Sequence, residues 1–213
     1  MSDDRSEGDA ARIVIDLFVT LDGVAQAPGA PEEDPSGGFR FGGWQAPFPD
    51  PRLGETIMSG IRSMDALLLG RRTYDIFAGY WPQQLHTEIG RTFQGLPKYV
   101  ATRNPGLALE WEGSERIGAD LAVELGALRR RHREIHVIGS VDLVQTLVSE
   151  RLFDEMRLWV YPIVLGEGSR VFPGGAAPTS LALLEPPVVG DSGAVLLRYG
   201  LLPGVPQTGT IEA

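Results

Sequence analysis

An apolar run that ends in a glycine followed by two arginines constrains the fold of this chain more than any other feature. Residues 65–69 are mostly leucine and alanine and predict a buried strand. Directly after them come Gly70, Arg71, Arg72 and Thr73. Glycine permits a tight turn, and Thr73 can open the next helix. Free backbone N–H groups at such a helix start attract phosphate, and the arginines add positive charge. The pattern predicts a strand-turn-helix unit with an anion-binding corner.

A second junction of the same kind occurs later in the chain. The apolar residues 135–138 predict another buried strand, and it is followed by Gly139, Ser140, Val141 and Asp142. Each corner alone has a plainer interpretation, because any α/β protein needs a glycine after a strand. Two phosphate-receptive corners on one sheet instead predict a dinucleotide held across the edge of that sheet.

A third candidate segment follows the predicted strand 97–102. Thr102 and Arg103 place a hydroxyl and a guanidinium at the carboxyl end of that strand, where they suit a ribose 2′-phosphate. This pair favours NADPH over NADH. The alternative is a simple turn, since residues 104–106 read Asn-Pro-Gly.

The order of the predicted elements defines the fold class. Strands are expected at residues 13–19, 65–69, 97–102, 135–138, 154–161, 180–189 and 194–200. Helices are expected at residues 52–63, 72–78, 83–95, 119–132 and 140–150. Alternating β and α units predict a three-layer α/β/α fold with a mixed, mostly parallel central sheet. The last two strands, joined by the turn 190–193, predict an antiparallel hairpin at the C-terminal end, and the strand 154–161 alternates as if half exposed.

Length and composition bound the remaining possibilities. We expect a single domain over residues 12–203, between flexible termini at 1–11 and 204–213. The net charge of −9 argues against a nucleic-acid partner. The chain has no cysteine, which excludes thiolate chemistry and fits a reducing cytoplasm. No apolar run is long enough to cross a membrane, and the acidic start is not a signal peptide. We therefore predict a cytoplasmic protein without a membrane partner.

The stretch 22–50 is a long loop, rich in glycine and proline, whose aromatic residues predict an ordered cover over a site. Phe41 or Trp44 would stack on a substrate ring, or alternatively form the core of the loop or a dimer contact. Two acids are candidate proton donors. Asp22 follows the first strand and is otherwise an Asp-Gly turn, whereas Glu55 lies on the predicted helix 52–63 and is otherwise a surface carboxylate.

Other chemistries have weak support in the sequence. His132 and His136 are four residues apart, but the predicted helix ends between them, so no metal site is expected. The basic run 129–133 complements a helix dipole rather than binding nucleic acid. Residues 166–171 begin like a dinucleotide-binding fingerprint but lack its third glycine, and no Gly-x-Ser-x-Gly motif is present.

Taken in order, these segments resemble the dihydrofolate reductase-like superfamily. Within this superfamily they resemble the branch that contains the C-terminal reductase domain of bifunctional riboflavin-biosynthesis enzymes. The matching pieces are residues 21–24, 67–74, 98–103, 137–140 and 162–168. The resemblance, closest to stand-alone bacterial members, implies a homodimer that binds NADPH. It implies phosphate contacts from Gly70, Arg71, Arg72 and Thr73, a ribose-phosphate site at Thr102 and Arg103, and pyrophosphate contacts from Gly139, Ser140, Val141 and Asp142.

The sequence also departs from this branch. Riboflavin-pathway reductase domains have a glutamate before the glycine of the second junction, where this chain has Ile138, and no deaminase signature is present. We therefore expect an NADPH-dependent reductase of a small pterin- or pyrimidine-like substrate. The alternatives are a stand-alone 5-amino-6-(5-phosphoribosylamino)uracil reductase of riboflavin biosynthesis, or a nucleotide-binding module without catalysis.

Overall fold

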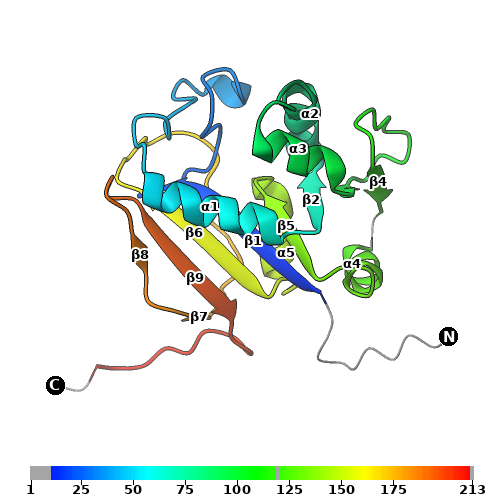
Figure 1. Cartoon of the computed structure of the whole chain (residues 1–213). Coiled ribbons are helices and arrows are strands. Elements are labelled where there is room, and N and C mark those ends of the chain that lie inside the picture. The colour runs from blue at the N-terminus through cyan, green and yellow to red at the C-terminus, as the bar shows by residue number, and fades with distance from the viewer. Residues whose placement is uncertain (1–10, 119, 212–213) are drawn as a thin grey trace.

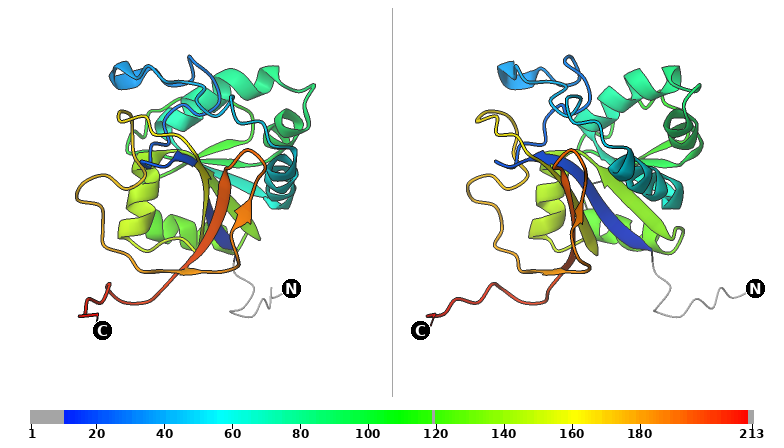
Figure 2. Two further views of the ribbon diagram at one scale, coloured as in Figure 1. Left: turned by 90° about the vertical axis from the view of Figure 1, so that its left-hand side faces the viewer. Right: turned by 60° about the vertical axis from the view of Figure 1, so that its left-hand side comes forward.

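The computed structural model describes residues 11–118 and 120–211. The predicted flexible N-terminus therefore lies outside the described residues except for Ala11, as do the last two residues of the predicted C-terminal segment. Within the described part, helices pack on both sides of one central sheet (Figures 1 and 2).

The sheet has nine strands in the described residues, with the order β4-β3-β2-β5-β1-β6-β9-β7 and β8 paired to β9. Their bounds are β1 Arg12–Thr20, β2 Ala66–Gly70, β3 Lys98–Ala101, β4 Ser114–Ile117, β5 Glu134–Ile138, β6 Glu155–Tyr161, β7 Leu181–Leu183, β8 Val188–Val189 and β9 Val195–Leu201. The first six strands in this order pair in parallel, whereas β9 is antiparallel to β6, β7 and β8. The predicted mixed sheet and antiparallel C-terminal strands are confirmed.

The α-helices are α1 Pro51–Ser63, α2 Arg71–Tyr80, α3 Glu88–Gly95, α4 Leu121–Arg129 and α5 Val141–Ser149, with 3₁₀ turns η2 Ser36–Gly38 and η3 Trp81–Gln83. Leucines of α4 and α5 pack with the odd-numbered residues of β1, such as Ile13 and Ile15. Helices α1, α2 and α3 cover the opposite face, where they pack on Leu67 and Leu69 of β2. These two clusters produce the three layers that the sequence predicts (Figure 2).

Three elements differ from the sequence-based expectation. β4 was not expected, because its Ser-Glu-Arg-Ile sequence is polar and it lies at the sheet edge. The single strand expected at 180–189 is divided into β7 and β8, because Pro186 and Pro187 have no backbone N–H to donate. The helix expected at 83–95 begins only at Glu88, where Thr87 caps it.

β6 is buried on both faces, so the prediction of a half-exposed strand was wrong. Glu155 is 1% exposed and Arg157 is 8% exposed, although both carry charge. They lie under α1, where Gly60 leaves room for Arg157, and their charges are neutralised locally. The alternation in the sequence therefore separates two buried environments, one apolar and one ionic.

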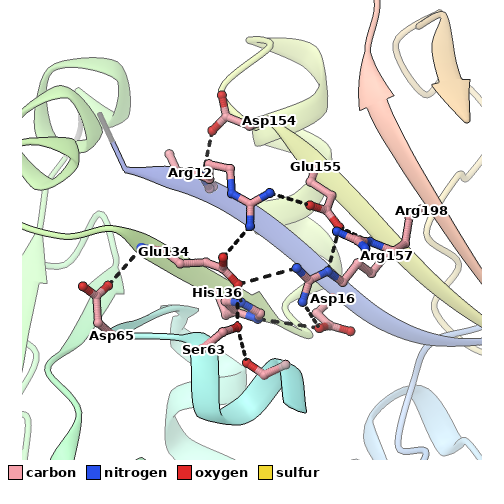
Figure 3. A network of polar contacts seen from close by, with 12 residues as sticks. Arg12, Asp16, Ser63, Asp65, Glu134, His136, Asp154, Glu155, Arg157 and Arg198 are labelled. Atoms are coloured by element: carbon pink, nitrogen blue, oxygen red, sulfur yellow. Dashed lines mark hydrogen bonds and ion pairs between the residues drawn. The ribbon is translucent and has the colours of Figure 1, made fainter. Parts of the chain in front are cut away.

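The ionic environment is a network across four adjacent strands (Figure 3). The Glu155 carboxylate accepts hydrogen bonds from Arg12 of β1, Arg157 of β6 and Arg198 of β9. The fully buried His136 of β5 lies 2.7 Å from Glu134 through its Nε2 atom. The network fastens α1 as well, because Ser63 donates to Glu134 at 2.8 Å.

Candidate active site

Three of the predicted cofactor segments follow three neighbouring parallel strands. Thr102 follows β3, Arg71 follows β2 and Gly139 follows β5, and these strands are adjacent in the order β3-β2-β5. Because the strands are parallel, their carboxyl ends lie at one edge of the sheet. The topology therefore places the segments side by side along that edge.

The two glycine corners touch each other directly. The Gly70 N–H donates to the Ser140 hydroxyl oxygen at 2.7 Å. A Cβ atom on Gly70 would lie 2.7 Å from that same oxygen, and one on Gly139 would lie 3.4 Å from the Thr73 side chain. Gly139 has a φ of +74° and Ser140 a φ of +61°. The second turn thus doubles back in the left-handed region and closes against the first.

The helices that start at these corners have open N-termini. Side chains of Asp50, Thr87 and Asp120 cap α1, α3 and α4. In the described residues, α2 and α5 are the α-helices with no side-chain cap at their N-caps, Gly70 and Ser140. Their first N–H groups and the positive ends of their dipoles are therefore available to an anion.

The arginines of the first corner point in different directions. Arg71 pairs with Asp75 one turn along α2, at 2.7 Å. Arg72 instead donates to the Ser36 hydroxyl at 3.2 Å and lies 3.8 Å from Asp34. Arg72 thereby lines a polar cavity of about 430 Å³. Its other walls are Gln26, Ser36, Gly37, Gly38, Phe39, Glu167, Gly168 and Ser169.

The Thr102–Arg103 segment forms the turn that was its alternative interpretation. The Thr102 hydroxyl accepts from the Asn104 N–H at 3.1 Å, and the Asn104 side chain accepts from the Gly106 N–H at 3.0 Å. Arg103 is exposed on this turn. Because Arg103 is exposed, this turn still allows its side chain to bind a ligand at the carboxyl edge of the sheet.

A second cavity, of about 270 Å³, lies between the long loop, α1 and the end of β6. Its lining residues are Pro28, Gly29, Gln45, Ala46, Phe48, Pro49, Asp50, Leu53, Gly54, Ile57 and Tyr161. The buried Tyr161 hydroxyl accepts from the Gln45 side-chain amide at 2.7 Å. Burial raises the pKa of Tyr161, so this group stays a protonated phenol at neutral pH.

Asp22, a candidate proton donor, joins two loops instead. Its carboxylate accepts from the Thr20 hydroxyl at 2.7 Å, the Leu165 N–H at 3.2 Å and the Gly166 N–H at 2.9 Å. Arg170 adds an ion pair at 3.2 Å. Although desolvation opposes it, these contacts lower the pKa of Asp22, so the group is ionised and has no proton to donate.

Glu55, the other candidate acid, lies away from both cavities. Its carboxylate is 72% exposed and pairs with Arg62 at 3.0 Å, and Arg62 also binds Glu88 of α3. Gly54 and Ile57 on the same helix line the smaller cavity, whereas Glu55 does not. This is the surface carboxylate that its alternative interpretation describes.

The aromatic residues predicted to stack on a substrate have other partners. Trp44 is 4% exposed, and its indole N–H donates to the Gln26 carbonyl oxygen at 2.8 Å. It forms the core of the long loop, edge-on to Tyr161. Phe41 is 39% exposed and contacts Phe39. Neither Trp44 nor Phe41 lines the two cavities described above.

The residues that sequence reasoning missed are Gln45, Phe48 and Tyr161. Tyr161 has a signal in the sequence, because it ends the alternation of Glu155, Arg157 and Trp159 and so must lie at the carboxyl end of β6. Gln45 and Phe48 have none, since their positions depend on how the long loop folds over α1.

His132 and His136, the two histidines considered for a metal site, have structural partners. His132 shares a hydrogen bond of 2.8 Å with the Tyr99 hydroxyl, and His136 belongs to the ionic network. Among the residues described, no group of three or more His, Asp or Glu side chains is arranged to hold a metal ion. Within that same part of the chain, every helix is too short or too polar to cross a membrane.

One family model covers most of the chain, and one curated relative matches it over a similar length. The sequence model of the RibD C-terminal domain matches residues 11–191. The uncharacterised protein YyaP of Bacillus subtilis is 29% identical over 167 residues, covering 76% of this chain and 80% of that protein.

Solved structures share the fold. A protein from Shewanella sp. PV-4, provisionally named a riboflavin biosynthesis protein, superposes with a TM-score of 0.69 at 19% identity, over 90% of this chain and 99% of that one. A dihydrofolate reductase from Enterococcus faecalis, complexed with NADP(H) and RAB-propyl, superposes with a TM-score of 0.56 at 15% identity, over 89% of this chain and 96% of that one. At these identities the likeness establishes the fold.

Proposed function

The chain belongs to the RibD C-terminal domain family, and from that membership we propose that it is an NADPH-dependent reductase of a small pterin- or pyrimidine-like substrate. The observation that carries the proposal is the row of three turns after β3, β2 and β5, with uncapped helices at two of them. An extended, doubly phosphorylated cofactor matches such a row better than a compact anion does.

The residues of each turn have a defined part in this proposal. The N-termini of α2 and α5, with Gly70, Thr73, Ser140, Val141 and Asp142 around them, hold the pyrophosphate. Gly139 permits the backbone turn between the two corners, because its φ of +74° favours glycine. Thr102 and Arg103 hold the 2′-phosphate. Arg72 can exchange its contact with Ser36 for a phosphate oxygen, since that contact is exposed, whereas Arg71 contributes charge from its pair with Asp75.

The smaller cavity is the proposed substrate site. It opens beside the end of β6, which is two strands from β5 in the sheet. NADPH, when bound, supplies a hydride, and the protein must hold the acceptor ring and exclude water around it. Phe48, Leu53 and Ile57 give the cavity apolar walls, and Tyr161 supplies a phenol as the hydrogen-bond donor. We assign the hydrogen-bond donor of this site to Tyr161, and we assign no proton-donor role to Asp22 or Glu55.

Cofactor preference tests the proposal. We expect NADPH to bind more tightly than NADH in a fluorescence titration. The Arg103→Ala variant should weaken NADPH binding about tenfold and leave NADH binding unchanged, because one charge-assisted phosphate contact is lost. Arg130→Ala on α4 is the matched control, since Arg130 is exposed on the opposite side of the sheet and bonds to Gly126 of its own helix. Equal affinity for the two cofactors would contradict the assignment.

The family match also favours a second candidate, the 5-amino-6-(5-phosphoribosylamino)uracil reductase of riboflavin biosynthesis. Turnover of that compound with NADPH separates it from the broader proposal. A nucleotide-binding module without catalysis is distinguished by NADPH binding without hydride transfer to any folate, pterin or pyrimidine tested.

A further inference from the structure

The charges of the residues that line the smaller cavity distinguish substrates that carry a phosphate from substrates that do not. Its lining residues include one carboxylate, Asp50, and no arginine, lysine or histidine among the described residues. The basic residues of the candidate site, Arg71, Arg72 and Arg103, follow β2 and β3, whereas the cavity lies beside β6 at the other side of β5 and β1. A phosphate-bearing ligand therefore has partners at the cofactor edge and none in this lining.

Asp50 makes the cavity unfavourable for a second negative charge. One of its oxygens accepts from the Leu53 N–H at 3.0 Å, and the other accepts from the Ser192 N–H and hydroxyl at 2.9 Å each. The Leu53 and Ser192 N–H groups lower the pKa of Asp50, which keeps it ionised at neutral pH. The positive end of α1 is thus already occupied by a carboxylate and is closed to a phosphate.

The remaining polar groups suit a neutral ring. The Tyr161 hydroxyl accepts a hydrogen bond from the Gln45 amide, which leaves its own hydrogen as a donor, because no acceptor for it is found in the described residues. The carbonyl oxygen of Gln45 is an acceptor beside it. Phe48, Leu53 and Ile57 form apolar walls around this pair. A donor next to an acceptor, set in an apolar slot, matches the C=O/N–H edge of a lactam ring.

Resting on the proposed reductase function, we propose that this cavity binds a planar, uncharged lactam heterocycle without a phosphate group, with Tyr161 and Gln45 reading its C=O/N–H edge. Arg52 does not change this assignment, because it is exposed on α1 and is not part of the lining. The riboflavin-pathway substrate in its phosphorylated form is then a poorer ligand than the same compound without its phosphate.

A matched pair of ligands tests this inference. Calorimetry on the full chain would compare 5-amino-6-(5-phosphoribosylamino)uracil with the same compound lacking its phosphate. We expect the phosphate-free compound to bind at least about tenfold more tightly, because the phosphate charge approaches Asp50 without a cationic partner. Equal or tighter binding of the phosphate ester would overturn the inference, and so would failure of both compounds to bind.

Two variants test whether the ligand binds in this cavity. Tyr161→Phe keeps the ring and removes the donor, so binding of the phosphate-free compound should weaken about tenfold. Asp50→Asn keeps a good N-cap residue and removes the negative charge. The difference in affinity between the phosphate ester and the phosphate-free compound should therefore become smaller. Tyr80→Phe, at a half-exposed site on α2, is the control and should leave binding unchanged. Unaltered binding in Tyr161→Phe would contradict the assignment.

An NADPH titration of the same samples keeps the two proposals apart. If NADPH binds and the phosphate ester is preferred, the inference about the cavity fails and the reductase proposal stands. If NADPH does not bind while the phosphate-free ring does, the reductase proposal fails and the cavity assignment stands.

Discussion

Single residues fix the geometry of the cofactor edge through close backbone contacts. The Gly70 N–H donates to the Ser140 hydroxyl, and Gly139 and Ser140 turn the second corner with positive φ. A Cβ on Gly70 would lie 2.7 Å from the Ser140 hydroxyl oxygen, whereas Gly139 is constrained by its φ of +74°, since a Cβ there would meet Thr73 only at an ordinary contact distance of 3.4 Å. The spacing of the two corners is therefore set by small side chains rather than by charge.

Replacing Gly139 tests the left-handed backbone conformation of the second corner. Gly139→Ala puts a side chain on a residue with a φ of +74°, so the free energy of unfolding should fall. About 1–2 kcal/mol is expected for an alanine in this region, measured by urea denaturation. NADPH affinity should fall as well. Gly79→Ala on α2 is the control, because its Cβ would meet nothing within 4 Å. An equally stable Gly139→Ala variant would contradict the left-handed conformation of this turn.

His136 gives the fold a defined dependence on pH. Burial alone would lower its pKa, but the carboxylates of Asp16 and Glu134 outweigh this and raise the pKa above its ordinary value of 6.5. The stabilisation from protonated His136 is therefore fully present below pH 6.5 and is lost as the pH rises through the higher, folded-state value. The hydrogen bond from His136 is also the main cause that lowers the pKa of Glu134.

The His136→Gln variant tests this dependence. We expect it to lower the free energy of unfolding by about 2 kcal/mol near pH 6, because a buried charged partner of Glu134 is removed. The difference from the unmodified protein should shrink towards pH 9. Urea denaturation at several pH values gives the comparison. A difference that grows with pH would show that His136 is neutral in the folded protein.

At the scale of elements, one carboxylate connects the start of the long loop to the segment after β6. Asp22 binds the backbone of Leu165 and Gly166 and the side chain of Arg170. Backbone hydrogen bonds from Ala25 to Ser169 and from Val171 to Gly23 run beside it. The two loops therefore behave as one unit that walls the polar cavity near Arg72.

Asp22→Asn should loosen this unit without unfolding the sheet. Asparagine keeps the size of the side chain but loses the ion pair with Arg170, so we expect a loss of about 1 kcal/mol in stability. Amide hydrogen exchange should become faster at residues 23–25 and 165–171 while β1 and β6 remain protected. If amide exchange became faster in β1 and β6 as well as in the two loops, Asp22 would not act only on these loops.

The elements were more predictable from the sequence than the site. Apolar runs such as Leu67–Leu69 and the glycines after them identify parallel strands, because the residues dictate both burial and turn geometry. The contacts of Asp22 and Trp44 were not predictable, because each depends on a residue more than ten positions away, Leu165 for the first and Gln26 for the second. Glu155 and Arg157 misled because they pair with each other, and Arg12 on β1 and Arg198 on β9 also bind Glu155.

At the scale of the whole molecule, the proposed cofactor and substrate sites lie at the ends of different strands of one sheet. The strands β3, β2 and β5 end at the proposed cofactor edge, whereas β6 ends at the proposed substrate cavity. The homodimer that the resemblance implies stays a prediction, which light scattering in solution would check. Half-exposed Leu184 and Val189, beside β7 and on β8, are the first positions at which to look for a contact between subunits.

Glu155 also sets an order of events for a chain emerging from the ribosome. Its partners include Arg12 of β1 and Arg198 of β9, the first and last strands among the described residues. While β9 is still inside the exit tunnel, β6 lacks its antiparallel neighbour, and the carboxylate lacks one of its three guanidinium partners. The nascent chain thus completes the hydrogen bonds of Glu155 only once β9 has been synthesised, and a chain that stops before β9 leaves this buried carboxylate with one partner fewer.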